Sequence, residues 1–267
     1  MKDLLLLSRD DDAEPKRVET AIRLAQLLHA TITCLDVDES SLLHDDVAGY
    51  TADGRALQQL VRNQARDHRE RLQGLFAREN LSVEWVARGG RVLDELPAEA
   101  AFHDLTIVSA APASLSGKNG SAIVSALVCQ SRSPALLLPE DMSAPDLKHR
   151  AIVAWDGSAP CIAALRAAMP LLAATEQVSI IQIGACEHGA TIQRAADYLK
   201  RHGVYAHVEE LAGDWEASRT LLARCRPSRV GYCVMGAFSR WRGIEQAFGG
   251  TTIDMIAKSR VPLFIAH

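Results

Sequence analysis

The chain has 267 residues, of which 48% are hydrophobic and 23% are charged. This length suits two domains of about 130 to 140 residues each, and the composition is that of an ordinary globular protein, which excludes extensive disorder. The net charge is −4 and no run of basic residues occurs, so nucleic acid is not an expected partner.

The cellular compartment is indicated by what the chain lacks. No apolar run approaches the roughly 18 residues that a membrane-spanning helix needs, so no membrane partner is expected. The early apolar run 4–7 is strand-sized and too short for a signal peptide. The six cysteines include no C-x-x-C pair, and most lie in apolar patterns where a free thiol packs as a small hydrophobe. These features predict a cytoplasmic protein without a disulfide framework.

The first half alternates short apolar runs with segments of helical periodicity. Apolar residues recur every three or four positions, as in Val18, Ile22 and Ala25. Pro15 suits the first turn of the same helix. The apolar runs, such as 4–7, show no alternation, which is typical of strands buried on both faces of a parallel sheet. The expected elements are strand 3–8, helix 15–29, strand 31–37, helix 53–79, strand 81–87, helix 91–102, strand 105–109, helix 120–131 and strand 134–138.

The second half repeats this order. Ser259-Arg260-Val261-Pro262 near its end matches Ser131-Arg132-Ser133-Pro134 in the first half, and a helix-like segment precedes each. The expected elements are strand 150–155, helix 159–173, strand 178–183, helix 189–202, strand 204–210, helix 215–225, strand 230–235, helix 250–259 and strand 261–266.

The chain is therefore interpreted as a divergent tandem repeat, with repeat 1 over residues 1–140 and repeat 2 over residues 149–267. The polar segment 139–145 carries two prolines and is the expected linker. Segment 40–54 has no counterpart in repeat 2 and is expected to be an extra loop or lid. Strands that alternate with helices predict an α/β fold of two tandem, doubly wound, five-stranded parallel-sheet domains.

Ligands of open α/β sheets bind beyond the carboxyl ends of the strands, where the strand order reverses. In repeat 2, residues 154–158 follow the first strand and residues 235–252 follow the fourth. These two segments meet at such a point if the first and fourth strands are neighbours.

The same segments carry a family resemblance. Residues 234–267 resemble the closing signature of the universal stress protein family, and residues 153–158 resemble its opening strand. The resemblance implies an adenine nucleotide alpha hydrolase-like fold with strand order 3-2-1-4-5 in each repeat. It also implies an intramolecular pseudo-dimer about a pseudo-twofold axis, in which the last strands at 135–138 and 263–266 meet. A homodimer of the whole chain stays open.

The nucleotide-binding members of this family carry G-x-x-G, nine residues, and then G followed by Ser or Thr. Gly236 and Gly249 stand at the first and third glycine positions of this pattern. Ser239 stands at the second, and Gly250 replaces the Ser or Thr, with Thr251–Thr252 directly after it. The resemblance thus implies that repeat 2 binds ATP or a related adenine nucleotide, with or without Mg²⁺.

The chemistry of these residues is compatible with that role. Glycine lets backbone amides approach phosphates, and a helix that starts near Gly250 offers its amides and its positive dipole end. Thr251 and Thr252 could add hydroxyl donors, and Asp156 could accept hydrogen bonds from a ribose or an adenine amine. A purely structural interpretation stays open, in which the glycines satisfy turns and Asp156 begins an Asx turn before Gly157.

Repeat 1 has lost most of the pattern. The loop after its fourth strand has no glycine before Gly117, and only Gly120-Ser121 resembles the end of the motif. The triplet Asp10-Asp11-Asp12 would repel a triphosphate unless a divalent cation intervened, and it otherwise is typical of a solvated turn. Repeat 1 is expected to be the non-binding or differently binding copy.

No catalytic residue and no metal site is predicted. The motifs G-x-S-x-G, H-E-x-x-H and G-x-x-x-x-G-K-[ST] are absent from the sequence. Cys186 and His188 have no visible second ligand pair for zinc, and Arg240 and Arg242 suit either phosphate or solvent. Three functions stay open: a nucleotide-responsive stress protein that acts through unknown protein partners, an interaction scaffold that binds no nucleotide, and a weak nucleotide hydrolase.

Overall fold

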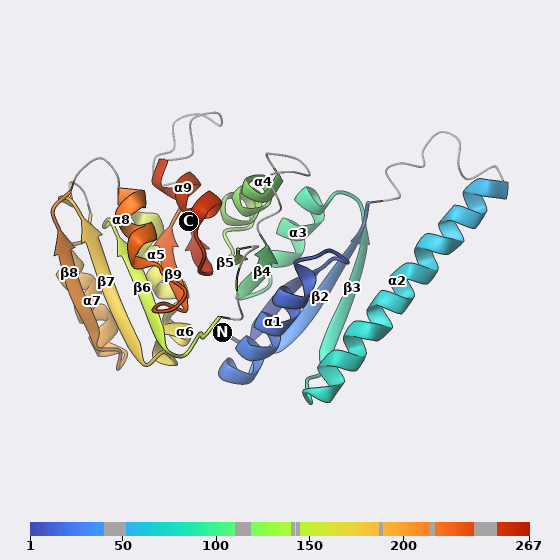
Figure 1. The fold of residues 1–267 in the computed structure, drawn as a ribbon, viewed down its shortest axis with the longest axis horizontal. Coiled ribbons are helices and arrows are strands. Elements are labelled where there is room, and N and C mark those ends of the chain that lie inside the picture. Colours follow the sequence, from blue (N-terminus) through green and yellow to red (C-terminus); the bar gives the residue numbers. More distant parts are fainter. Residues whose placement is uncertain are drawn as a thin grey trace.

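The described part of the chain forms one continuous ten-stranded sheet with helices on both faces (Figure 1). The computed structural model describes residues 1–39, 52–109, 119–139, 142, 145–186, 189–213, 217–237 and 250–267. For residues 52–58 and 119–121 it describes the backbone alone.

Repeat 1 supplies one half of the sheet. Its elements are β1 (Asp3–Ser8), α1 (Glu14–Leu28), β2 (Thr31–Asp38), α2 (Ala52–Arg78), β3 (Val83–Gly89), α3 (Val92–Ala100), β4 (Leu105–Ser109), α4 (Asn119–Ala126), the π-helical turn η3 (Leu127–Ser131) and β5 (Ala135–Leu138).

Repeat 2 supplies the other half. Its elements are β6 (Arg150–Trp155), α5 (Ala159–Ala167), α6 (Met169–Ala173), β7 (Gln177–Ile183), α7 (Ile192–Arg201), β8 (Ala206–Leu211), α8 (Ala217–Arg224), β9 (Tyr232–Gly236), α9 (Gly250–Lys258) and β10 (Leu263–Ala266).

The strand order β3-β2-β1-β4-β5-β10-β9-β6-β7-β8 contains the predicted order 3-2-1-4-5 twice, once in each direction. Strands are parallel within each half, and the halves join where β5 and β10 pair antiparallel. Phe264 lies opposite Leu136 at this seam, where the family resemblance implied that the two last strands meet. The antiparallel seam relates the halves by a pseudo-twofold axis. The domain limits 1–140 and 149–267 stay a prediction.

Each face of the sheet carries its own core. Along β1, Leu4 and Leu6 belong to the core that α1, α2, α5, α6 and α7 cover, whereas Leu5 and Leu7 belong to the core under α3, α4, α8 and α9. This is why the strand runs lack alternation, since both rows of side chains are buried. Among the described helices, none combines the length and the apolar character that crossing a membrane requires.

One helix prediction is wrong, because the structure has two helices where the sequence predicted a single one. The helix expected over 159–173 is interrupted at Ala168, and α6 begins at Met169 with Pro170 in its first turn. Proline has no amide hydrogen to donate to the preceding turn, so the chain starts a new helix there. The extra loop expected over 40–54 lies outside the described residues except where α2 begins at Ala52.

Candidate functional site

The strand order reverses at two places, between β1 and β4 and between β6 and β9. From β6 the chain moves outward to β7 and β8, and it returns to β9 on the other side, so β6 and β9 are direct parallel neighbours. The first and fourth strands of repeat 2 are therefore neighbours, which is the condition that the sequence analysis set for a site there. We call these two places the switch points of repeat 1 and repeat 2.

Asp156 lies at the switch point of repeat 2, directly after the last residue of β6, and its side chain is exposed. Its Oδ1 accepts a hydrogen bond from the amide of Ser158 at 2.9 Å, which is the Asx turn that the sequence allowed. Ser158 then caps α5, because its Oγ accepts from the amide of Cys161 at 3.3 Å. Among the described residues, none forms an ion pair with Asp156, so the carboxylate is open to solvent or to a ligand.

Gly157 is held by the segment that follows β7. Its φ is +73°, in the left-handed region that glycine adopts without strain, and its carbonyl accepts from the amide of Ala190 at 3.1 Å. The Trp155 indole donates to the carbonyl of Ala190 at 3.0 Å, and the Cys186 thiol donates to the carbonyl of Asp156 at 3.3 Å. The turn at Asp156–Gly157 is therefore fixed in place on one side of the switch point.

Gly236 ends β9, and the first turn of α5 explains why it is a glycine. A Cβ at Gly236 would lie 2.4 Å from the backbone nitrogen of Cys161 and 2.7 Å from the carbonyl carbon of Pro160. The Cys161 thiol beneath this contact donates to the carbonyl of Ala154 at 3.1 Å, and burial, together with the nearby Asp156 carboxylate, raises its pKa to about 12. Close packing is thus a sufficient reason for glycine here, whether or not a phosphate approaches.

The remaining predicted residues divide between described and undescribed positions. Gly250 is the exposed first residue of α9, and no described atom outside its own helix lies within 4 Å of where its Cβ would stand. Thr251 lines a hollow of about 550 Å³ between α8 and α9, and Thr252 is buried. Ser239 and Gly249, like Arg240 and Arg242, lie outside the described residues.

Repeat 1 has the same turn, but a buried arginine occupies its switch point. Asp11 Oδ1 accepts from the amide of Ala13 at 3.0 Å, just before α1, as Asp156 does before α5. The Arg17 guanidinium, almost wholly buried, pairs with the same Asp11 oxygen at 2.9 Å. It also donates to the carbonyls of Leu7 and Arg9 and to the hydroxyl of Ser109, at 3.1, 2.8 and 3.2 Å. Arg17 therefore neutralises the carboxylate and links the ends of β1 and β4.

A hollow of about 820 Å³ lies beside this point in repeat 1, beyond the carboxyl ends of β1 and β2 and against α2. We call it the β1–β2 hollow. Its lining includes Asp10, Asp36, Asp38, Asp67 and His68. Burial raises the pKa of Asp36, and the charges of Asp38 and Glu14 add to this rise while His68 and Arg69 oppose it.

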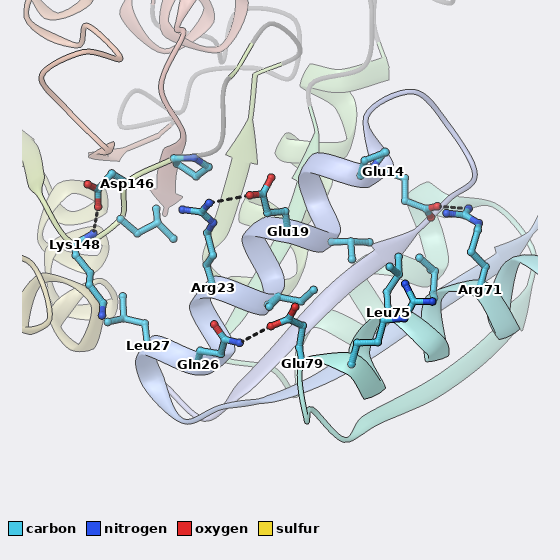
Figure 2. A pocket seen from close by; sticks show the side chains of 17 residues that line it. Glu14, Glu19, Arg23, Gln26, Leu27, Arg71, Leu75, Glu79, Asp146 and Lys148 are labelled. Carbon is cyan, nitrogen blue, oxygen red and sulfur yellow. Dashed lines mark hydrogen bonds and ion pairs between the residues drawn. The ribbon is translucent and has the colours of Figure 1, made fainter.

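Sequence reasoning did not find the charged cluster at the edge of this hollow. The buried Glu14 carboxylate lies 2.7 Å from His68 Nε2 and 2.8 Å from an Arg71 nitrogen. Arg71 also lines a neighbouring groove of about 910 Å³ between α1, α2 and residues 145–148, where Figure 2 shows its pairing with Glu14. Because Glu14 and His68 are far apart in the sequence, no local pattern indicates that they meet.

Several solved proteins are similar to this chain in three-dimensional structure. No family model matches it, and no curated protein matches it either. A universal stress protein from Archaeoglobus fulgidus DSM 4304 has a TM-score of 0.72 at 18% identity and covers 99% of this chain and 95% of its own. A candidate universal stress protein from Pseudomonas aeruginosa UCBPP-PA14 has a TM-score of 0.60 at 15% identity, with coverage of 100% and 93%. The functionally unknown protein PA1789 from Pseudomonas aeruginosa PAO1 has a TM-score of 0.58 at 16% identity, with coverage of 100% and 92%.

These likenesses extend over both halves of the chain. They define an α/β protein with two doubly wound parallel sheets joined through their last strands. The chain has the fold of the universal stress proteins, in a form that carries two such units. At these identities the likeness establishes the fold alone, so function has to be argued from the site.

Proposed function

We propose that this chain is a stress-response protein that binds ATP or a related adenine nucleotide at the switch point of repeat 2 and acts through association with protein partners. The observation that carries the proposal is the difference between two equivalent carboxylates. In repeat 1 the chain's own Arg17 neutralises Asp11, whereas Asp156 in repeat 2 is exposed and pairs with no described cation. The fold shared with universal stress proteins supports the same assignment.

Two kinds of contact that a nucleotide needs support the proposal. Asp156 can accept hydrogen bonds from a ribose hydroxyl or an adenine amine with its second carboxylate oxygen, since Oδ1 already holds the turn. The amides and the positive dipole end of α9 at Gly250 suit phosphate oxygens, and Thr251 is the adjoining hydroxyl. Ser239 and Gly249 belong to the proposed phosphate loop by their spacing, and Mg²⁺ belongs to the proposal only as a companion of the nucleotide.

Calorimetric titration of ATP, ADP and AMP, with and without Mg²⁺, tests this proposal. We expect Asp156→Ala to weaken ATP binding about ten- to a hundredfold, because a charge-assisted hydrogen bond contributes about 1.5–3 kcal/mol. Asp156→Asn separates the two roles of the residue, since the amide oxygen can still accept from Ser158 and only the charge is lost. If Asn preserves full affinity while Ala does not, Asp156 acts through the turn alone.

The matched variant in repeat 1 is Asp11→Asn, with folding checked by circular dichroism. Unchanged ATP affinity in this variant supports the assignment to repeat 2, whereas a loss confined to it would place the site in repeat 1. No binding to the wild-type chain would contradict the proposal. It would favour the interaction scaffold instead, which the packing explanation for Gly236 already allows.

A further inference from the structure

Three side chains with metal-binding atoms converge at the edge of the β1–β2 hollow. Asp10 comes from the turn after β1, Glu14 opens α1 and His68 lies in α2. One ligand atom from each lies within 4.8 Å of the others, a spacing that a single cation can bridge after small side-chain movements. The imidazole Nε2, rather than Nδ1, is the His68 atom that faces Glu14, at 2.7 Å.

In the structure the guanidinium of Arg71 balances the charge of the Asp10 and Glu14 carboxylates, and this side chain can move away. Arg71 places one guanidinium nitrogen 3.0 Å from Asp10 Oδ1 and 2.8 Å from Glu14 Oε2. The Arg71 side chain is 48% exposed, whereas that of Glu14 is 2% exposed. Arg71 can therefore turn into solvent at little cost, but the buried Glu14 carboxylate then needs another positive partner. The arginine occupies the place that a bound cation would take.

A second feature of the hollow points to a ligand. Ser8 ends β1, lines the hollow and is buried, yet its Oγ has no hydrogen-bond partner among the residues that the structure describes. Ser8 belongs to the same row of β1 as Leu4 and Leu6, which faces α1 and α2, and its neighbour in the sheet is Asp36. A buried hydroxyl without a partner is uncommon, and a water molecule held by a cation in this hollow would satisfy it.

We propose that Asp10, Glu14 and His68 bind a divalent first-row transition-metal ion, for which Zn²⁺ is the best fit. Imidazole nitrogen with carboxylate oxygens is a donor set that such ions accept, and three protein ligands leave a position for water. Ser8 and Asp36 face the hollow where that water would lie. Binding displaces Arg71 from the two carboxylates and ties α2 to the start of α1. This site is independent of the nucleotide proposal, because it belongs to the other repeat.

Titration of ZnCl2 into the full-length chain, with MgCl2 in parallel, tests the assignment. We expect saturable Zn²⁺ binding to the wild type and at least about a tenfold loss of affinity in His68→Gln and in Asp10→Asn, since even an outer-shell partner contributes that much. Gln at position 68 can still hydrogen-bond Glu14, and Asp10 is 77% exposed, so both variants are designed to fold. His103→Gln and Asp12→Asn are the matched controls and should bind as the wild type does.

Arg71→Gln distinguishes a metal site from a purely structural ion cluster. Removing the competing charge should raise Zn²⁺ affinity at least about fivefold, the effect of one like charge at 4 Å in water. Three results would each overturn the proposal: no saturable Zn²⁺ binding to wild type, equal affinity in wild type and Asp10→Asn, or weaker binding in Arg71→Gln. Cys186→Ser should leave the affinity unchanged, which excludes the thiol of repeat 2 as the source of the signal.

Discussion

The two switch points use one backbone plan with different side chains. In each repeat an aspartate holds the turn before the first helix, through Asp11 in repeat 1 and Asp156 in repeat 2. The fourth strand ends in Ser109 in one repeat and in Gly236 in the other. In repeat 1 Arg17 spans from the turn to Ser109, whereas in repeat 2 the first turn of α5 packs directly on Gly236.

Under the proposed function, this difference explains how repeat 1 can be stable without a ligand. The hydrogen bonds that a bound ligand could make at the switch point are made in repeat 1 by the chain itself, through Arg17. Arg17 also neutralises the charge of Asp11 in repeat 1. In repeat 2 the equivalent carboxylate stays exposed, which costs little in water and leaves it available.

Replacing Arg17 is expected to have the largest effect. Arg17→Ala leaves the carbonyls of Leu7 and Arg9 without their donor and removes the partner of Asp11, so we expect a loss of about 3 kcal/mol in the free energy of unfolding. Arg23→Ala is the control, because its ion pair with Glu19 is exposed and should contribute less than about 0.5 kcal/mol. Urea denaturation at neutral pH measures both, and similar losses would contradict a structural role for Arg17.

The glycine at the end of β9 should give a smaller effect. A methyl group at Gly236 meets backbone atoms of α5, so Gly236→Ala is expected to destabilise the chain by about 1 to 3 kcal/mol. Gly250→Ala is the matched control, since its Cβ would stand in open space and alanine favours a helix by up to about 1 kcal/mol. A Gly236→Ala variant as stable as the wild type would show that packing does not require this glycine.

The start of the first strand offers the smallest effect. Burial raises the pKa of the Asp104 carboxyl. The hydrogen bonds from the amides of Lys2 and Asp3, with the charges of the amino terminus and His103, lower the pKa by a larger amount, so it lies below its ordinary value. A lowered pKa adds stability above the unfolded pKa of about 3.9, and this stability is lost as the pH falls through the folded value.

Asp104→Asn should therefore destabilise the chain by less than about 1 kcal/mol at pH 7, because the carboxyl is half exposed, and by less at pH 2, where more of the carboxyl is protonated. Gly231 takes the equivalent place in repeat 2, where its amide donates to Arg150 as that of Asp104 donates to Asp3. Urea titrations at both pH values give the difference. An equal destabilisation at both would show that the charge is not what matters.

The sequence predicted the fold well because its signals are local. Unbroken apolar runs indicated parallel strands, and the repeated order of elements indicated two units. That these units meet through their last strands was implied by the family resemblance alone. Four strand starts were predicted two residues early, at Leu81, Val204, Val230 and Val261. The amides of Leu81 and Val204, for example, donate to carbonyls of the preceding helix, those of Phe76 and Leu199, and so are not available to the sheet. Apolar character alone cannot show this difference.

The site was less predictable than the fold, because its contacts are not local. The Asx turn at Asp156 could be seen in the sequence, since donor and acceptor are two residues apart. The contact of Gly236 with Cys161 and the bond from Arg17 to Ser109 join residues more than 70 positions apart. In the sequence, Arg17 cannot be distinguished from an ordinary helix residue. Only the fold shows that it links the ends of β1 and β4.

We infer that only repeat 2 holds a nucleotide. Photo-crosslinking with 8-azido-ATP, followed by mapping of the labelled peptides, tests this inference, with excess unlabelled ATP as the competitor. We expect competable label on peptides that contain Asp156 or the segment 236–252, and a marked reduction of that label in Asp156→Ala. Competable label confined to the peptides around Asp11 and Ser109 would contradict the account, because it would show that Arg17 does not close the switch point of repeat 1.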